Sequence, residues 1–581
     1  MRPCMIKTSP AACSLIFFGI FLISSACSLP LTSTRTPKNT PAASLLSDNH
    51  TVLPPEVYYH FLTGQACIGR QDWSCAISEF TSALDYDKGS PYLNLQIGQL
   101  YTMKGDFDEA VIWCKKALSL DSAYLEAHYI LARVYAALNK YDDAVAEYSS
   151  ILEIAPDDEE AYLTLSLLYA EQKNHVAAEK TIKKLLKINP LSETGYFYLG
   201  NIYLDLKKTN RAEKNYLKAL EINPAFESAL VNLAIIYENQ NNITKAIDTL
   251  QKILQENPEN YRVRDKLAYL HIKANNLEDA LQNFIYIRDS KPSLTEEISI
   301  KIGLIYFEKE QWEPAAQAFA HALEKNSSND RTRYYLGSAL EKASKADEAK
   351  IIFTAIPATS KYYSQTQIHL AYLYDIQGDK ETAKKTIREA LKIKTDDLEL
   401  YRFLASLLEK DNSFLEAIQV LKDSLLIKQD DEEILFYLGV LYDKASMLQE
   451  SIEAMQSVLT INERNADALN FIGYTYADKG INLDEAEKLI KRALKIKPDD
   501  GYIIDSLGWV YFKKGKLGKA LNELKEAGKL APKDPVIADH LGDAYLKNNE
   551  PDNALEMYKK SQELDPSKLH IQKKIDEIKN K

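Results

Sequence analysis

Apolar and polar positions along the chain follow a helical period that restarts at regular intervals. In residues 193–226, apolar residues recur three and four positions apart in two successive stretches, which is typical of amphipathic helices. Each stretch predicts a helix of about 13 residues, which is roughly 20 Å long. Pro224 has no backbone N–H and is expected to end the second helix. The pattern predicts a pair of helices joined by a short turn.

This helix pair recurs with a period of 34 residues that begins at Val57. Fifteen small residues form one column of the repeat: Gly64, Gly98, Ala132, Ser166, Gly200, Ala234, Ala268, Gly303, Gly337, Ala371, Ala405, Gly439, Gly473, Gly508 and Gly542. A second column of small residues follows twelve or thirteen positions after the first, as at Ala212. In eleven of the fifteen repeats, a Tyr stands three positions after the first column, as at Tyr203. The small residues are expected to let the paired helices approach closely. Because one pair cannot bury both of its apolar faces, neighbouring pairs must stack.

These columns resemble the tetratricopeptide repeat (TPR) over residues 57–568. The resemblance implies an all-α fold, a right-handed α-α superhelical solenoid of about 15 helix-turn-helix repeats with a long concave groove. Residues 569–581 are predicted to form one more helix, which caps the last repeat because an uncovered apolar end would aggregate.

Two irregularities interrupt the repeat. Pro357 falls inside the expected second helix of repeat nine (330–363) and should break it, which makes 357–365 a candidate hinge. This predicts an N-terminal block, 57–329, and a C-terminal block, 364–568. Repeat thirteen has one extra residue within 477–486, which should lengthen the turn between its helices.

The N-terminus follows the order of an export signal. Residues 11–23 are apolar, too few to cross a bilayer core as a helix, and small residues follow up to Cys27. This arrangement resembles the lipobox of bacterial lipoproteins, although the usual leucine three residues before the cysteine is Ser24 here. The resemblance implies that a signal peptide, 1–26, is removed and that Cys27 is lipidated. The alternative is an ordinary secretory signal and a secreted periplasmic protein.

Residue 28 is Ser rather than Asp, which in lipoproteins of the enterobacterial kind implies sorting to the outer membrane, facing the periplasm. Between 28 and 55, 14 of the 28 residues are Ser, Thr or Pro, so the segment 27–55 is expected to be a disordered tether. The acidic body would then contact the membrane through the lipid anchor only.

The charge and the motifs exclude several classes of protein. A formal net charge of −12 argues against binding to nucleic acid. The chain has no HExxH sequence, paired CxxC, phosphate-binding glycine loop or GxSxG elbow. We therefore expect no enzymatic activity, catalytic residue, metal, cofactor or small-molecule substrate.

Cys67 and Cys75 lie on the two predicted helices of the first repeat and roughly face each other. In an oxidising compartment a disulfide would be plausible. The alternative is a pair of small buried residues, because the repeat favours small side chains there.

The first helix of each repeat supplies the candidate binding residues, because such solenoids bind partner segments along that surface. In repeats five to seven, Asn201, Asn232, Arg262 and Lys266 stand where the family's carboxylate clamps place Asn, Asn, Lys and Arg. The clamp's first Lys is replaced by Phe197. The alternative is that these polar residues are structural or solvated.

In the C-terminal repeats the candidate groove residues are aromatic or acidic: Tyr474, Tyr502, Asp505, Trp509, Asp539 and Asp543. Aromatic anchors among acids suit the capture of a protein partner. Trp509 stands at a position that is often polar in the family, so packing is expected to explain it poorly. The alternative is packing between repeats.

Residues 469–545 are similar to the C-terminal repeats of long TPR lipoproteins of Gram-negative bacteria, with the motifs GYTYAD (473–478), DSLGW (505–509) and HLGDAY (540–545). One branch of these lipoproteins is an outer-membrane adaptor that binds and activates a periplasmic carboxyl-terminal processing protease. This implies a lipid-anchored scaffold with protein clients. The alternative is an assembly factor for a secretin, pilus or exopolysaccharide exporter.

Overall fold

The structure is a computed structural model that describes residues 53–579. The predicted signal peptide, Cys27 and nearly all of the tether 27–55 lie outside the described residues. Within 53–579 the chain forms 31 α-helices and no strand. It divides into two compact units, Met1–Ala280 and Leu281–Lys581.

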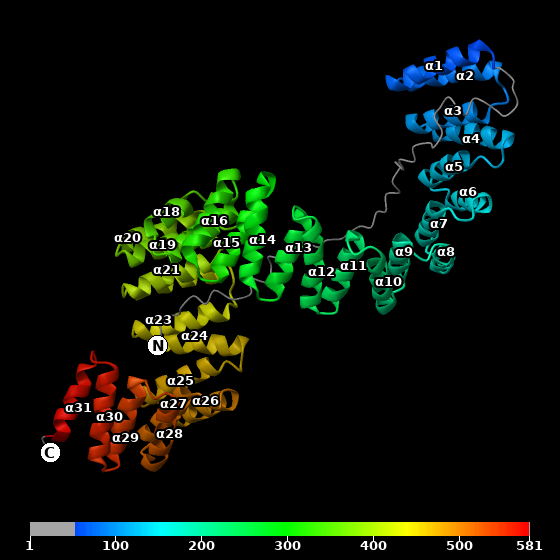
Figure 1. Cartoon of the computed structure of the whole chain (residues 1–581). Helices are drawn as coiled ribbons and strands as arrows, with labels where there is room; N and C mark the ends of the chain where they lie inside the picture. Colours follow the sequence, from blue (N-terminus) through cyan, green and yellow to red (C-terminus); the bar gives the residue numbers. More distant parts are fainter. Residues whose placement is uncertain (1–52, 580–581) are drawn as a thin grey trace. The chain divides into compact units, whose positions relative to one another are not determined.

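The first unit holds seven helix pairs, one for each of repeats one to seven, with the division falling inside α14. In chain order the helices are α1 (Pro55–Gly69), α2 (Trp73–Tyr86), α3 (Pro91–Lys104), α4 (Phe107–Leu120), α5 (Leu125–Ala137), α6 (Tyr141–Ile154), α7 (Glu159–Glu171), α8 (His175–Ile188), α9 (Glu193–Asp205), α10 (Thr209–Ile222), α11 (Glu227–Asn239), α12 (Ile243–Glu256), α13 (Tyr261–Lys273) and α14 (Leu277–Ser290). From α1 to α13 each helix packs on its neighbours in sequence (Figure 1).

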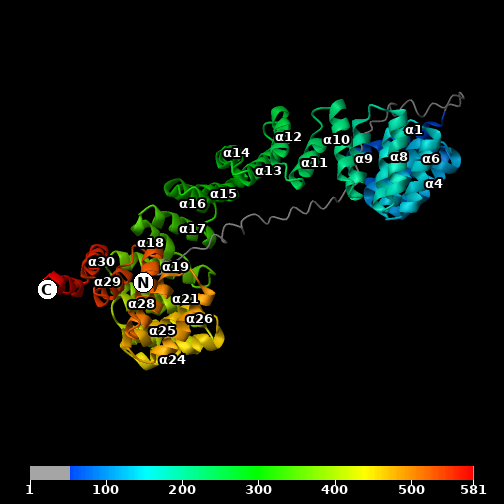
Figure 2. The same ribbon diagram turned by 90° about the horizontal axis from the view of Figure 1, so that it is seen from below.

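The second unit holds repeats eight to fifteen and a last single helix (Figure 2). After a short 3-10 turn, Pro292–Leu294, its helices are α15 (Thr295–Glu308), α16 (Trp312–Lys325), α17 (Asp330–Lys342), α18 (Ala346–Thr354), α19 (Tyr363–Ile376), α20 (Lys380–Ile393), α21 (Leu398–Lys410), α22 (Phe414–Leu425), α23 (Glu432–Lys444), α24 (Leu448–Ile461), α25 (Ala466–Lys479), α26 (Leu483–Ile496), α27 (Gly501–Lys513), α28 (Leu517–Leu530), α29 (Pro535–Lys547), α30 (Pro551–Leu564) and α31 (Leu569–Lys579). The predicted all-α fold of fifteen helix pairs and a final helix is confirmed.

The column of small residues holds each pair together by close approach. At Gly200 an added Cβ would lie 2.5 Å from Cε1 of Tyr216, which comes from the second helix of the same pair and is fully buried. Gly542 stands in the same relation to Tyr558, also at 2.5 Å. A side chain at these positions would collide with an aromatic ring, so the column favours glycine wherever the partner is bulky.

The turn inside each pair requires a residue with positive φ, such as Asn241 or Gly515. Asn and Gly adopt this conformation at the lowest cost. The turn of repeat thirteen has two such residues, Gly480 and Asn482. The second one accommodates the extra residue that the sequence indicates for this turn.

The irregular repeat nine has a shortened second helix. α18 has 9 residues where α16 and α20 have 14, and it ends three residues before Pro357. A buried cluster nevertheless continues across the turn, from Phe353 before it to Leu370 after it. The division between compact units lies inside α14 rather than at this turn, so the hinge stays a prediction.

The final helix closes the apolar end of the last repeat. Ile571 and Ile575 of α31 are buried in a cluster with Ala554 and Tyr558 of α30. Its other face is polar, with charged residues such as Lys573 and Glu577. This is the arrangement expected of a terminal cap.

Candidate binding surfaces on the first helices

An ion pair joins the first helices of repeats fourteen and fifteen. Nδ1 of His540 on α29 lies 2.9 Å from Oδ2 of Asp505 on α27, and both side chains are buried. The two residues are 35 positions apart, one repeat plus one residue. This spacing places them opposite each other on neighbouring first helices.

The ring of His540 lies against aromatic side chains. It stacks on Trp509 with ring centroids 4.0 Å apart and an interplanar angle of 13°, and Tyr474 of α25 lies 6.2 Å away. Trp509 in turn stacks on Phe512, at 4.9 Å. The imidazole is therefore sandwiched inside the protein between two first helices.

Burial opposes the positive charge on His540, but the carboxylate of Asp505 outweighs this effect, helped by the nearby Asp539 and Asp543. The pKa of His540 is consequently raised above its ordinary value. When the imidazole is protonated, it forms a charge-assisted pair with the Asp505 carboxylate in a site of low dielectric. Such a pair stabilises one arrangement of α27 and α29. Because the two charges neutralise each other inside the protein, they are not available to bind a partner protein.

A second set of ionic contacts ties the cap helix α31 to α29. Nζ of Lys574 lies 2.7 Å from Oδ1 of Asp539 and 2.8 Å from Oδ1 of Asp543. His570 also contacts Asp539, and the hydroxyl of Tyr558 donates to Asp543. We call Asp505, Trp509, Asp539, His540 and Asp543 the C-terminal cluster.

The C-terminal cluster corrects part of the sequence interpretation. Trp509 is 7% exposed, Asp505 5% and Asp539 8%, because residues of the next first helix or of the cap cover them. The expectation that packing explains Trp509 poorly is therefore wrong. Tyr474 is half-buried beside the cluster, whereas Tyr502, at the start of α27, remains 60% exposed.

The candidate clamp of repeats five to seven is only partly assembled. Oδ1 of Asn201 on α9 accepts hydrogen bonds from the Tyr216 hydroxyl at 2.6 Å and from Nδ2 of Asn232 at 3.0 Å. Lys266 on α13 instead pairs with Glu238 of α11 at 2.6 Å, and Arg262 is exposed. The structure brings the two Asn residues together around Tyr216, and carboxylate binding by the four residues stays a prediction.

The aromatic side chain in place of the clamp's first Lys packs on the following repeat. The ring of Phe197 lies 5.2 Å from Phe226, just before α11, and 5.8 Å from Tyr216. These contacts make the first-helix surface of repeats five and six partly apolar. A lysine at this position would remove the packing between the two repeats.

Cys67 of α1 and Cys75 of α2 are joined by a disulfide in the structure, with Cα atoms 5.8 Å apart. The bond fastens together the two helices of the first repeat. Cys114 is a buried free thiol, and burial raises its pKa to about 12.

The described part of the chain contains no group of three or more His, Cys, Asp or Glu side chains arranged to hold a metal ion. Over residues 53–579 no helix combines the length and the apolar character that crossing a membrane would require.

The chain matches family models described as tetratricopeptide repeat over 91–124, 113–166, 139–199, 194–226, 215–248, 240–283, 300–361, 364–397, 466–500 and 538–568, together more than half of its length. It belongs to the tetratricopeptide repeat family. These models describe a repeat and indicate no enzyme family. TPR proteins in general bind protein partners, and the TPR fold generally serves as a non-catalytic scaffold for protein interactions.

The other proteins that resemble this TPR protein match it over a short stretch or at low sequence identity. A TPR repeat-containing protein of Pseudomonas aeruginosa is 46% identical over 46 residues, which is 8% of each chain. Among solved structures, the hetero-tetramer Cut9-Hcn1 is 14% identical with a TM-score of 0.34 and covers 90% of this chain and 96% of its own. A TPR protein from Parabacteroides merdae is 17% identical with a TM-score of 0.36, covering 49% of this chain and 98% of its own. These values support no inference about function.

Proposed function

We propose that this TPR protein is a non-enzymatic scaffold that binds a protein partner at the exposed start of α27 and α29. The observation that carries the proposal is the contrast between Tyr502 and its surroundings. Tyr502 is 60% exposed and Val536, one repeat later at the start of α29, is 37% exposed. The C-terminal cluster fixes the helices that present them. An exposed tyrosine on a helix that is held in place by buried contacts is a typical anchor for a protein partner.

The location of the scaffold forms the second part of the proposal. Lipidation of Cys27 would hold the chain on the outer membrane, facing the periplasm, with residues 27–55 as a tether. The Cys67–Cys75 disulfide supports an oxidising compartment. The partner implied by the C-terminal resemblance is a periplasmic carboxyl-terminal processing protease. The alternative is an assembly role in a secretin, pilus or exopolysaccharide system.

The partner surface is tested by affinity isolation from native membranes with a double variant, Tyr502→Ser with Val536→Ser. We expect this variant to lose the partner that the wild-type chain retains, because the apolar anchors are removed without touching the C-terminal cluster. Tyr59→Ser is the matched control, since Tyr59 is 66% exposed on α1. Retention of every partner by the double variant would refute the proposed surface.

Trp509→Ala is unsuitable for this experiment, because Trp509 is buried and its removal would act through stability. The identity of the retained partner separates the two roles. A protease supports the adaptor, and a secretin or exporter subunit supports the assembly factor.

The anchor is tested separately by metabolic labelling with palmitate. The wild-type chain should incorporate the label and sediment with membranes, and Cys27→Ser should do neither. An unlabelled wild-type chain would contradict lipidation and favour the secreted form.

A further inference from the structure

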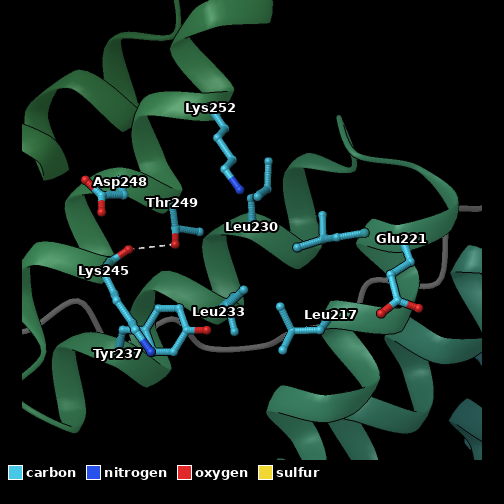
Figure 3. A pocket seen from close by; sticks show the side chains of 10 residues that line it. Leu217, Glu221, Leu230, Leu233, Tyr237, Lys245, Asp248, Thr249 and Lys252 are labelled. Carbon is cyan, nitrogen blue, oxygen red and sulfur yellow. Dashed lines mark hydrogen bonds between the residues drawn. The ribbon is translucent and has the colours of Figure 1, made fainter.

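A hollow of about 430 Å³ lies between the second helices of repeats five and six. Its walls come from α10 and α12 and its floor from α11 (Figure 3). Tyr502, Val536 and the candidate clamp contribute nothing to it. The hollow belongs entirely to the first compact unit.

At the hollow, repeat six lacks a bridging pair of side chains that two other repeats have. In repeat one, His60 and Glu79 meet at 2.7 Å across the equivalent positions, and in repeat three His128 and Glu147 meet at 2.6 Å. Repeat six has Leu230 and Thr249, also 19 residues apart, in their place. The Thr249 hydroxyl donates to the carbonyl of Lys245 on its own helix, at 2.7 Å. The polar bridge that repeats one and three have at these positions is therefore absent from repeat six.

The floor and one wall of the hollow are apolar. Leu230 and Leu233 form the floor and are almost fully buried. Leu217 of α10 is 40% exposed at the wall. The positions that correspond to Leu217 in repeats two and four carry Lys115 and Lys183, so an exposed leucine there is unusual in this chain.

Two ammonium groups from α12 border this apolar floor. The side chain of Lys252 extends toward Leu230, and that of Lys245 reaches the ring of Tyr237, 5.4 Å from its centroid (Figure 3). Two carboxylate side chains also line the hollow, Asp248 from α12 and Glu221 at its far edge (Figure 3). Within residues 53–579 neither lysine forms an ion pair. The lining therefore carries two positive and two negative side chains, and of these the side chain of Lys252 extends toward Leu230 (Figure 3).

We propose that the hollow binds a bulky apolar side chain of a partner protein with a carboxylate next to it. The apolar group would pack over the floor of Leu230 and Leu233 and bury the exposed Leu217, and the carboxylate would pair with Lys252. The volume suits a few side chains. The hollow is open to solvent, which suits a side chain presented by a protein surface more than a free molecule that needs enclosure.

The experiment is a selection of phage-displayed random dodecapeptides on the purified full chain. Selected peptides are then measured on a filled variant, Leu230→His with Thr249→Glu, which places the native pair of repeats one and three in the hollow. We expect peptides that combine a bulky apolar residue with an adjacent Asp or Glu and bind the filled variant about tenfold more weakly. Lys252→Glu should weaken them by a similar factor, and Lys214→Glu, on the exposed side of α10, should not.

Three results would overturn the proposal: no peptide distinguishes the wild-type chain from the filled variant, the dependent peptides are basic, or only lauric acid distinguishes the two proteins. The last result would assign the hollow to a free amphiphile. If circular dichroism shows that the filled variant does not fold, Leu217→Glu replaces it, with the same expected loss.

Discussion

The first-helix surface differs between two parts of the chain, repeats five to seven and repeats thirteen to fifteen, although both are built from the same repeat. In repeats five to seven, on α9, α11 and α13, the half-buried amides of Asn201 and Asn232 meet around the Tyr216 hydroxyl, and Arg262 is exposed. In repeats thirteen to fifteen, on α25, α27 and α29, the C-terminal cluster covers the equivalent surface except at the start of α27 and α29, where Tyr502 and Val536 stay exposed. The first helices have 13 or 14 residues in both regions, and in repeats five and fifteen a glycine lies against a buried tyrosine ring of the second helix. Two or three side chains per repeat decide whether the surface stays open or is closed by the protein itself.

The two parts also differ in what holds them. The amide contacts of repeats five and six are neutral hydrogen bonds, each with a net contribution of about 1 kcal/mol. The buried pair of Asp505 and His540 joins a carboxylate to an imidazole whose pKa is raised, so removing one partner leaves a desolvated group without compensation. We therefore expect the C-terminal surface to be rigid and sensitive to substitution, and the surface of repeats five to seven to be tolerant.

The largest expected effect follows from breaking the buried pair. Asp505→Ala should destabilise the C-terminal repeats by about 3 kcal/mol, because His540 loses its counter-charge inside the protein. Asn201→Ala is the matched change in the other region and should cost about 1 kcal/mol. Urea unfolding followed by hydrogen exchange of α27 and α9 measures both. Equal losses would remove the distinction between the two regions.

A second pair of substitutions tests whether the helix pairs beneath the two surfaces are equivalent. Gly200→Ala and Gly542→Ala each place a Cβ 2.5 Å from a buried tyrosine ring, which should cost about 1–3 kcal/mol in both cases. Thermal unfolding of each variant measures the loss. A markedly larger loss at one site would show that the difference between the regions extends into the packing of the pairs.

The smallest expected effect is a dependence on pH that only the C-terminal region shows. Because the pKa of His540 is raised in the folded chain, its contribution is complete below the ordinary pKa of about 6.5 and is lost as the pH rises through the raised value. The loss of stability caused by His540→Gln should therefore be larger at pH 6 than at pH 9, by about 1 kcal/mol. Urea titrations at both pH values measure this loss. Asn201→Ala should show no such change, and a His540 effect that grows with pH would contradict the assignment.

The fold could be predicted from the sequence because the repeat imposes one requirement at fixed intervals. Close approach of two helices demands a small residue at Gly200 and at the equivalent position of every repeat, so the column is visible without a structure. The break before Pro357 follows equally directly from its missing N–H. The continuous packing across that turn depends on side chains such as Phe353 and Leu370, which no local pattern reveals.

The C-terminal cluster was harder to predict because its contacts join different repeats. The sequence singled out Asp505, Trp509, Asp539 and Asp543 but missed His540 and Lys574, which cover them. One signal was present: opposite charges recur one repeat plus one residue apart, as in Asp505–His540 and Asp539–Lys574, and again in Asp375–Lys410 at 2.6 Å. The sequence analysis missed the hollow between α10 and α12 for another reason. It is lined by Leu230 and Thr249, which stand where repeats one and three have a His–Glu pair, and this difference is visible only when the repeats are compared.

The accessibility of Trp509 tests the central claim most directly, since it shows whether the C-terminal repeats close their own surface. A full-length chain in which Trp73, Trp113 and Trp312 are replaced by Phe has Trp509 as its one remaining tryptophan, and acrylamide quenching reports its exposure. We predict weak quenching in the folded chain, rising to that of free indole only in concentrated denaturant. Strong quenching under native conditions would contradict the account, because it would leave Trp509 open to solvent and to partners.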